Sequence, residues 1–351
     1  MGSTSYLVTT VAEISFPLIH TRFGWCLPII FLWLLLACLT SCNRENIYLV
    51  YDDGKHLYIS EVDNPNPTLL LPNIYGISPD ASPNGQLLSF ISDGSSDRLI
   101  GTWNIHSNLE WHKHPEFGQF IFNPTPLNRS THLFSALRSG HLDIYSSGQK
   151  NNITNFRSMD FQPSVSPNGY RLAFTSNRIS NTDIYTNERP LSDRQAIENI
   201  QEWNITERGI IYNTYRDHNI DIFTSNIDGT NPLRLTFARA LDHQPDWSHD
   251  GEWIVFSSLR HSNSEIFIIR KDGNKLKRLT NNQYNDEDPS WSPDGNLIAF
   301  ISDRSGSKNI YTMKPDGTKQ IPISDTLSDL HSPTWIKCNP GIFGKVSKTC
   351  P

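Results

Sequence analysis

Acidic residues, histidines and glutamines gather at four places in this sequence, each just before or beside a proline. They are Asp160 and Gln162; Asp242, His243 and Gln244; Asp286, Glu287 and Asp288; and Asp329 and His331. Carboxylates and imidazoles bind divalent cations, and crowded carboxylates also gain from a Lys- or Arg-bearing partner. If the fold brings the four places together, they form an acidic binding site with two histidines. In the alternative interpretation these side chains cap turns and stay solvated.

The prolines at these places open a repeated segment. "PSWSPDG" at 289–295 is echoed by "PDWSHDG" at 245–251, "PSVSPNG" at 163–169 and "PDASPNG" at 79–85, each followed by a Phe five residues later. From that aromatic anchor, an Arg follows after four residues and a polar-Ile-aromatic triplet after nine. The anchors recur every 38 to 44 residues: Phe90 (with Gly94 in place of Arg), Phe134, Phe174, Tyr212, Phe256 and Phe300. A period near forty with four short strands per copy predicts an all-β propeller.

The number of blades follows from the two ends of the repeat region. Residues 46–71 resemble strands two to four of a blade without a first strand, and "SDLHSPTWIK" at 328–337 resembles a first strand with nothing after it. We therefore expect the C-terminal strand to complete the N-terminal blade, giving seven four-stranded blades, with six as the alternative. First strands line the channel of a propeller, so the four acidic places should meet at one mouth of it.

The repeated text "W-S-P-D-G … F-x-S-x-R … I-Y" resembles the WD-like repeat of the TolB propeller family over residues 46–337. The resemblance implies an extracytoplasmic propeller that binds an envelope protein or peptide, here of basic character. Two features differ from TolB, which has an α/β domain ahead of a six-bladed ring and is not a lipoprotein. A role in the Tol–Pal system therefore does not transfer directly.

The chemistry of related propellers gives the alternative function. Peptidases of the prolyl-oligopeptidase class need a G-x-S-x-G nucleophile motif, which this sequence lacks, as it lacks H-E-x-x-H and C-x-x-C. We expect no catalytic residues and no resident cofactor. Oligogalacturonate lyases, however, are propellers that hold a divalent metal with His and Gln in the channel. His243, Gln244 and His331 resemble part of such a set, so a metal-dependent lyase or hydrolase stays open.

The recurring Arg and the acid of the third strand call for a simpler explanation. Because both recur in five copies, we expect them to form a hydrogen-bonded Arg–carboxylate pair that braces the loop between the second and third strands.

The N-terminus has the layout of a secretory signal. Arg22 precedes an uncharged run from Phe23 to Thr40, and the run ends in "LTSC", which resembles a bacterial lipobox. The resemblance implies a lipoprotein signal peptide at 1–41, lipidation of Cys42, and a linker at 42–45 before the propeller at 46–337. An uncleaved anchor and an ordinary signal are the alternatives. The expected location is extracytoplasmic, with the lipid in the cell membrane or the outer membrane.

Cysteines and charge complete the prediction. Cys338 and Cys350 would remain in the exported chain, where a disulfide would close the tail at 338–351, although two free thiols are the alternative.

The formal net charge is -6, and no Lys/Arg cluster is present, which argues against nucleic acid as a partner. We expect a monomer whose only membrane contact is the lipid.

Overall fold

The computed structural model describes residues 46–338, except for the internal gaps 63, 71–74, 83, 94–97, 105–108, 115–116, 118–119, 129–130, 139, 148–151, 156, 167–170, 180, 187–188, 191–202, 207–208, 217–218, 325–326 and 328. The predicted signal peptide, Cys42, the linker and the tail after Cys338 lie outside these residues. So does the side chain of Cys338, and the predicted disulfide with it. Within the described part every regular element is a strand, and no helix is long and apolar enough to span a membrane.

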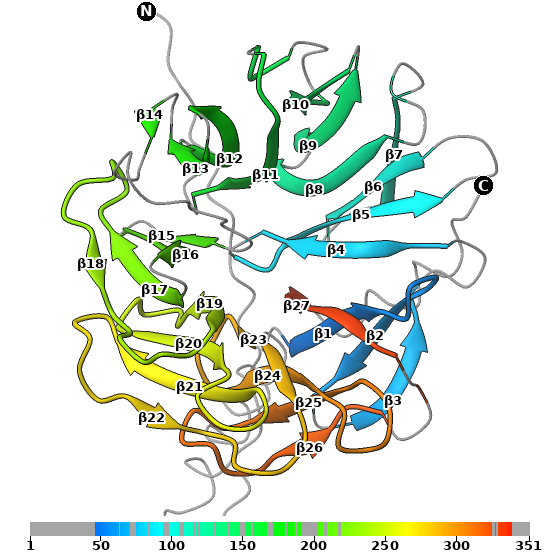
Figure 1. Ribbon diagram of the computed structural model, residues 1–351. Helices are drawn as coiled ribbons and strands as arrows, with labels where there is room; N and C mark the ends of the chain where they lie inside the picture. Colours follow the sequence, from blue (N-terminus) through cyan, green and yellow to red (C-terminus); the bar gives the residue numbers. More distant parts are fainter. Residues whose placement is uncertain are drawn as a thin grey trace, which may run out of the picture. The chain divides into compact units, whose positions relative to one another are not determined.

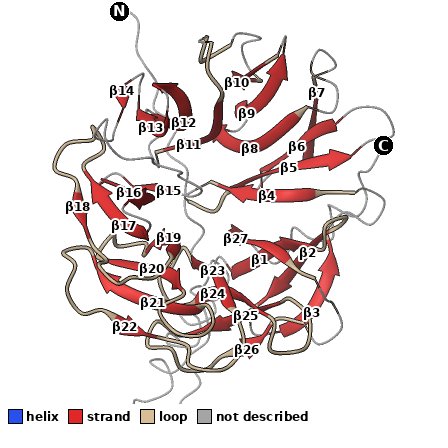
Figure 2. Cartoon of the chain, in the orientation of Figure 1, coloured by secondary structure: helices blue, strands red, loops and turns tan. Residues whose placement is uncertain are grey.

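Seven antiparallel sheets form the blades of a propeller (Figures 1 and 2). From the innermost strand outward they are β27 (His331–Cys338), β1 (Asn46–Asp52), β2 (Leu57–Glu61) and β3 (Asn64–Leu69) in blade 1; β4 (Ile77–Ala81), β5 (Leu87–Asp93), β6 (Arg98–Asn104) and β7 (Leu109–Lys113) in blade 2; β8 (Ile121–Asn128), β9 (Thr131–Arg138) and β10 (His141–Ser146) in blade 3; and β11 (Asp160–Val165), β12 (Leu172–Ile179), β13 (Asn181–Thr186) and β14 (Arg189–Pro190) in blade 4.

The remaining sheets are β15 (Trp203–Thr206), β16 (Gly209–Arg216), β17 (Asn219–Ser225) and β18 (Leu233–Arg234) in blade 5; β19 (Asp242–Trp247), β20 (Trp253–Ser258), β21 (Glu265–Arg270) and β22 (Lys277–Arg278) in blade 6; and β23 (Asp286–Trp291), β24 (Ile298–Ser302), β25 (Asn309–Met313) and β26 (Ile321–Pro322) in blade 7. The prediction of seven blades is confirmed. In the described residues blade 3 has three strands, and Tyr145 of β10 forms a single further bridge with Asn152.

The ring closes as the sequence predicts. β27 pairs antiparallel with β1, with Asn46 opposite Cys338 and Leu49 opposite Trp335. Leu49 and Trp335 then pack with Ile310 and Leu330 in the core between blades 7 and 1. The last strand of the chain therefore supplies the channel side of the first blade and covers the edge that β1 would otherwise expose.

Every blade except blade 2 is built on a stacked aromatic pair, which in blade 1 is Tyr51 and Tyr58 at 5.9 Å. Phe300 of β24 lies opposite Tyr311 of β25, and their ring centroids are 5.8 Å apart. Blades 3, 4, 5 and 6 repeat this pair at 5.8 to 6.0 Å. In blade 7 the Arg304 guanidinium lies over both rings, 5.3 Å and 4.6 Å from their centroids. The repeated Phe, Arg and Tyr thus form one stack, held by aromatic and cation–π attraction.

The buried partner of that Arg differs from the one we expected. Arg304 does not pair with the third strand; its Nη2 donates to both carboxylate oxygens of Asp286 on β23, at 2.8 and 2.7 Å. The acid of the third strand pairs outward instead, as Glu265 does with Arg278 of β22 at 2.6 Å. The expectation of an Arg–carboxylate brace was right about its role and wrong about its partner.

Blade 2 lacks the second aromatic residue of the stacked pair. Gly101 stands opposite Phe90, where other blades carry the second aromatic residue. A Cβ atom at Gly101 would lie 2.3 Å from Cζ of Phe90, so the Phe90 ring occupies the space of the missing side chain. Trp111 of β7 packs edge-on against the same ring at 5.6 Å. Phe90 therefore keeps an aromatic neighbour, supplied by the outer strand.

The blades give the propeller two chemically different faces. The entry face is the one on which the innermost strands begin, and the turn face carries the hairpin turns between first and second strands. These turns are polar: at 292–297, Ser292 Oγ accepts from Leu297 N at 2.9 Å and donates to Asp294 at 2.7 Å. Gly295 adopts the positive φ of 71° that the "SPDG" pattern predicts. Asn46 and Cys338 face each other at the turn-face ends of β1 and β27.

We predict that ring closure is needed for cooperative folding. Deleting residues 331–351 removes β27, exposes the edge of β1 and uncovers Leu49 and Ile310. The variant should aggregate or lose its single unfolding transition in calorimetry. Deleting only 339–351 leaves β27 intact and is the control. A soluble 1–330 chain with one cooperative transition would contradict the closure.

Candidate functional site

The innermost strands share an unusual backbone feature. In six of them the residue before the proline has a positive φ of 47° to 54°, and a β-bulge accompanies it: Ser78, Asn123, Gln162, Gln244, Asp288 and Ser332. The position before proline normally avoids helical conformations, and positive φ is strained for residues other than Gly. All six residues have polar side chains.

The bulge ties neighbouring blades together. The amide of the bulge residue donates to a side chain of the preceding blade. Asp288 N donates to Gln244 Oε1 at 2.9 Å, and Gln162 N donates to Ser135 Oγ at 3.1 Å. Ser78 N lies 3.3 Å from Asp52 Oδ2 of blade 1. Because these bonds connect consecutive blades, the strained conformation helps to hold the ring together. It also turns a polar side chain toward the channel in these six blades.

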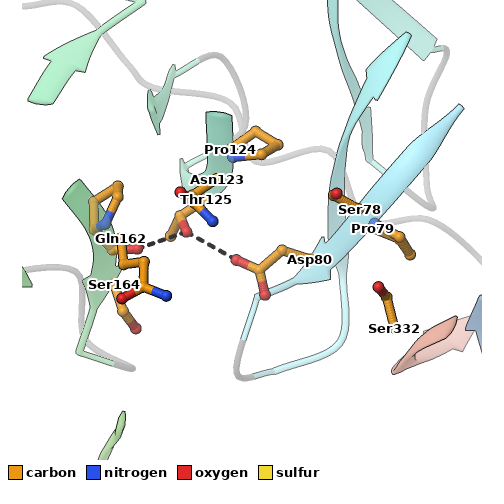
Figure 3. Close-up of a pocket in the computed structure, with 10 residues that line it drawn as sticks. Ser78, Pro79, Asp80, Asn123, Pro124, Thr125, Gln162, Ser164 and Ser332 are labelled. Atoms are coloured by element: carbon orange, nitrogen blue, oxygen red, sulfur yellow. Dashed lines mark hydrogen bonds between the residues drawn. The ribbon is translucent and has the colours of Figure 1, made fainter. Parts of the chain in front are cut away.

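A cavity of about 370 Å³ lies in the channel against blades 1 to 4 (Figure 3). Its walls are the bulge residues and the residues just after the prolines: Ser78, Pro79, Asp80, Asn123, Pro124, Thr125, Gln162, Pro163, Ser164 and Ser332. Thr125 Oγ1 of blade 3 donates to Asp80 Oδ2 of the preceding blade at 2.9 Å. Burial raises the pKa of Asp80 to about 6, against the lowering effect of this bond. The pocket thus offers amides, hydroxyls and a single carboxyl group.

The other side of the channel carries charge. Burial, with repulsion from Glu287, raises the pKa of Asp288 to about 6, while Lys308 and His331 oppose the rise. Burial lowers the pKa of His243, against the opposing effect of Glu287 and Asp242. The only cation paired with Glu287 in the described part is Lys308, at 3.9 Å. A Lys or Arg from a partner would therefore find the buried carboxyl group of Asp288 beside the partly exposed one of Glu287.

The structure divides the predicted site residues into two groups. Asp160, Asp242 and Asp286 are fully buried and bind Arg178, Arg260 and Arg304 of their own blades at 2.9, 2.8 and 2.7 Å. They brace the blades and do not reach the channel mouth as free acids. The partly exposed group is Gln162, His243, Gln244, Glu287, Asp288 and His331. Asp329 is exposed on the entry face, one residue before the position of Asp286 in the repeat.

Six lining residues were missed by sequence reasoning: Ser78, Asp80, Asn123, Thr125, Ser164 and Ser332. The signal that could have found them is the polar-Pro-polar triplet of the innermost strands, as in "SPD" at 78–80 and "NPT" at 123–125. Sequence reasoning concentrated on charge, whereas this part of the site is built mainly from neutral groups.

The entry face carries exposed apolar side chains. Tyr75, Phe120 and Met159, each four residues before the proline of its blade, are 56%, 54% and 50% exposed, and Leu241 occupies the same position in blade 6. Leu137 and Leu259 lie beside them, since their amides donate to the carbonyls of Phe120 and Leu241 at 3.0 Å. With Phe122 these residues form what we call the apolar arc. Blades 7 and 1 have Asn285 and Asp329 at the equivalent position.

The metal site that His243, Gln244 and His331 suggested can be compared with their surroundings. Across the described ranges, no group of three or more His, Cys, Asp or Glu is placed to hold a metal ion. Gln244, one of the three residues that resemble a lyase metal site, already accepts hydrogen bonds through Oε1 from Ser257 and from the amide of Asp288.

Comparison with known proteins agrees with this geometry. Residues 201–338 match the TolB beta propeller domain, which covers blades 5 to 7 and β27. Over that range the sequence resembles a TolB propeller domain. Its fold resembles a putative TolB from Agrobacterium tumefaciens, with 16% identity, a TM-score of 0.53, and coverage of 85% of this chain and 100% of that one. No curated protein sequence matches the chain.

Two further solved structures have a similar fold. TolB from Acinetobacter baumannii has 18% identity, a TM-score of 0.52, and coverage of 86% of this chain and 69% of that one. The propeller domain of the Trilobed protease from Pyrococcus furiosus has 11% identity, a TM-score of 0.57, and coverage of 81% and 96%. That domain has an open velcro topology, whereas β27 closes the ring here. At these identities the likeness concerns the fold alone.

We predict that the Asp286–Arg304 pair is structural. Arg304→Ala leaves the fully buried Asp286 carboxylate unpaired and should lower the free energy of unfolding by about 3 kcal/mol or more. The double variant Asp286→Leu, Arg304→Ala replaces both charges by apolar side chains, and Leu330 already occupies the position of Asp286 in blade 1, so it should regain much of that loss. Urea unfolding measures both.

The control is Lys308→Ala, which breaks a half-exposed pair with Glu287 and should change the unfolding free energy by about 1 kcal/mol or less. If Arg304→Ala were as mild as Lys308→Ala, or if the double variant were the least stable of the three, the brace would not have the role assigned here.

Proposed function

We propose that this protein is a lipid-anchored, extracytoplasmic and non-enzymatic TolB-like propeller that binds an envelope protein as a monomer. The observation that carries the proposal is the entry face, where the apolar arc borders a polar channel. Exposed large apolar side chains concentrated on one face of a soluble propeller mark a surface for another protein. The TolB-type repeat and the lipobox-like "LTSC" support the envelope location.

The two sides of the mouth indicate the chemistry of the partner. Blades 2 to 4 offer Tyr75, Phe120 and Met159, while blades 7 and 1 offer Asp288, Glu287 and exposed Asp329. A partner segment with a large apolar residue on one side and a Lys or Arg on the other would satisfy both. Its cation would compensate Asp288, whose pKa is raised by burial, and its approach would be steered by the field of the three carboxyl groups.

The anchor would leave this face accessible. β1 begins at Asn46 on the turn face, four residues after Cys42. A four-residue linker reaches at most roughly 14 Å, so a lipid on Cys42 would keep the turn face close to the membrane and direct the entry face away from it.

We predict that Cys42 carries the lipid. Cys42→Ala should abolish metabolic labelling with radioactive palmitate and leave an unprocessed precursor, because diacylglycerol transfer needs the thiol. Cys38→Ala, inside the apolar run, is the control and should label normally. Equal labelling of both variants would exclude anchoring through Cys42 and would leave the propeller's binding role to be tested separately.

We predict that the apolar arc and Asp288 contact the partner directly. A photo-reactive amino acid at Met159 should give a crosslinked adduct of discrete mass in intact cells. Phe120→Ser or Asp288→Asn in the same chain should weaken that adduct about tenfold, which corresponds to a loss of about 1.4 kcal/mol in binding.

The control positions are Leu276 and Ile321, which are also exposed apolar residues but lie at outer strands. A crosslinker at Leu276 should give no such adduct, and Ile321→Ser should leave the Met159 adduct unchanged. An adduct formed equally from Leu276, or one indifferent to both entry-face substitutions, would move the binding surface away from the entry face.

A further inference from the structure

Three imidazoles meet where blade 2 packs against blade 3. His112 lies on β7, His114 follows that strand, and His132 lies on β9. The ring centroid of His132 is 4.5 Å from that of His112 and 5.7 Å from that of His114. His132 is fully buried, and its Nδ1 lies 3.3 Å from Thr102 Oγ1. In the described part, the Nε2 atoms of His112 and His132 are enclosed without a hydrogen-bond partner.

The surroundings of this cluster are aromatic. The His114 ring lies 4.6 Å from Phe134, and Phe117 packs on Phe134 and Tyr145. The charged and titratable groups of these strands are Arg98 on β6, Glu110 and exposed Lys113 on β7, Arg138 on β9, and His141, Asp143 and Tyr145 on β10. Of these, Glu110 acts on His112, whereas the charges acting on His132 are the other two imidazoles.

The sign of the acid response follows from these surroundings. Burial lowers the pKa of His132 to about 2 and also lowers that of His112, so both rings are neutral in the folded protein. A lowered histidine pKa contributes stability that is complete above the unfolded value near 6.5 and is lost as the pH falls below it. Asp80 has the opposite sign, since its raised pKa favours the folded state on acidification.

The same interface carries part of the channel pocket. Thr125 of blade 3 donates to Asp80 of blade 2, and both residues line the cavity. Arg98 of blade 2 also donates to the carbonyl of Ile121 in blade 3, at 3.2 Å. A change in how blades 2 and 3 pack therefore changes the geometry of the pocket, although the histidines lie outside the channel.

We propose that the cluster of His112, His114 and His132 makes the contact between blades 2 and 3 acid-sensitive, so that mild acidification opens this seam and the pocket built across it. The unprotonated cluster packs as an aromatic group. In the opened state the imidazoles reach water and take up protons, which favours that state. This inference does not depend on the lipid anchor or on the identity of the partner.

Hydrogen exchange of the full chain tests the seam directly. Between pH 7.5 and 5.0, after correction for the intrinsic exchange rate, β7 and β9 should lose about 30-fold in protection if His132 alone titrates on opening. β20 and β21 of blade 6 should change much less. His132→Asn keeps a hydrogen-bonding group near Thr102 and should remove most of the acid response of β7 and β9.

Two further variants keep the result decisive. His112→Gln changes a partly exposed residue and should reduce the response even if His132→Asn does not fold. His249→Gln, on the polar turn between β19 and β20, is the control and should respond like the unmodified protein. Protection of β7 and β9 that follows blade 6 at both pH values, or an undiminished acid response in His132→Asn and His112→Gln, would overturn the proposal.

Discussion

The antiparallel pairing of β27 with β1 constrains everything else in this protein. An open ring of blades would expose two sheet edges and the apolar surface between blades 7 and 1, which Leu49, Ile310 and Trp335 fill. The register of the pair also fixes where the ring begins and ends: Asn46 and Cys338 are opposite each other on the turn face. The entry face is made of loops and strand ends away from this closing pair, and such segments can vary without disturbing closure.

Charge is used in two separate ways around the ring. Three residues before the proline, Asp160, Asp242 and Asp286 accept hydrogen bonds from Arg residues that lie on the aromatic stack of the same blade. Those carboxylates are compensated and hold each blade together. The residue before the proline and the residue after it face the channel instead. Among the described residues neither Asp288 nor Asp80 forms an ion pair with an Arg, and burial raises the pKa of both. One strand therefore supplies both the brace and the site.

The sequence predicts the architecture well because the repeat is local. Proline and glycine at fixed spacing specify the turns, and the aromatic anchors of the second strand specify the core, so seven blades and their closure follow from pattern alone. The site is harder, because in a regular strand Asp286 and Asp288 would share a face. The bulge at Asp288, with φ of 53°, breaks that alternation and separates the two carboxyl groups. Likewise, the exposure of Phe120 or Met159 has no signature in the sequence, since both residue types usually belong to cores.

Departures from the repeat fall in neighbouring blades. Blades 4, 6 and 7 have the complete Asp, Arg and aromatic stack, whereas blades 1, 2 and 3 have Leu330, Gly76 and Ile121 at the position of the bracing Asp. The channel pocket, most of the apolar arc and the histidine cluster all belong to blades 1 to 4. Repeat proteins conform to their consensus where only stability is required and depart from it where function adds another requirement. Three of the four blades that line the channel pocket therefore lack the bracing Asp, and the binding and the pH response that we propose involve those blades.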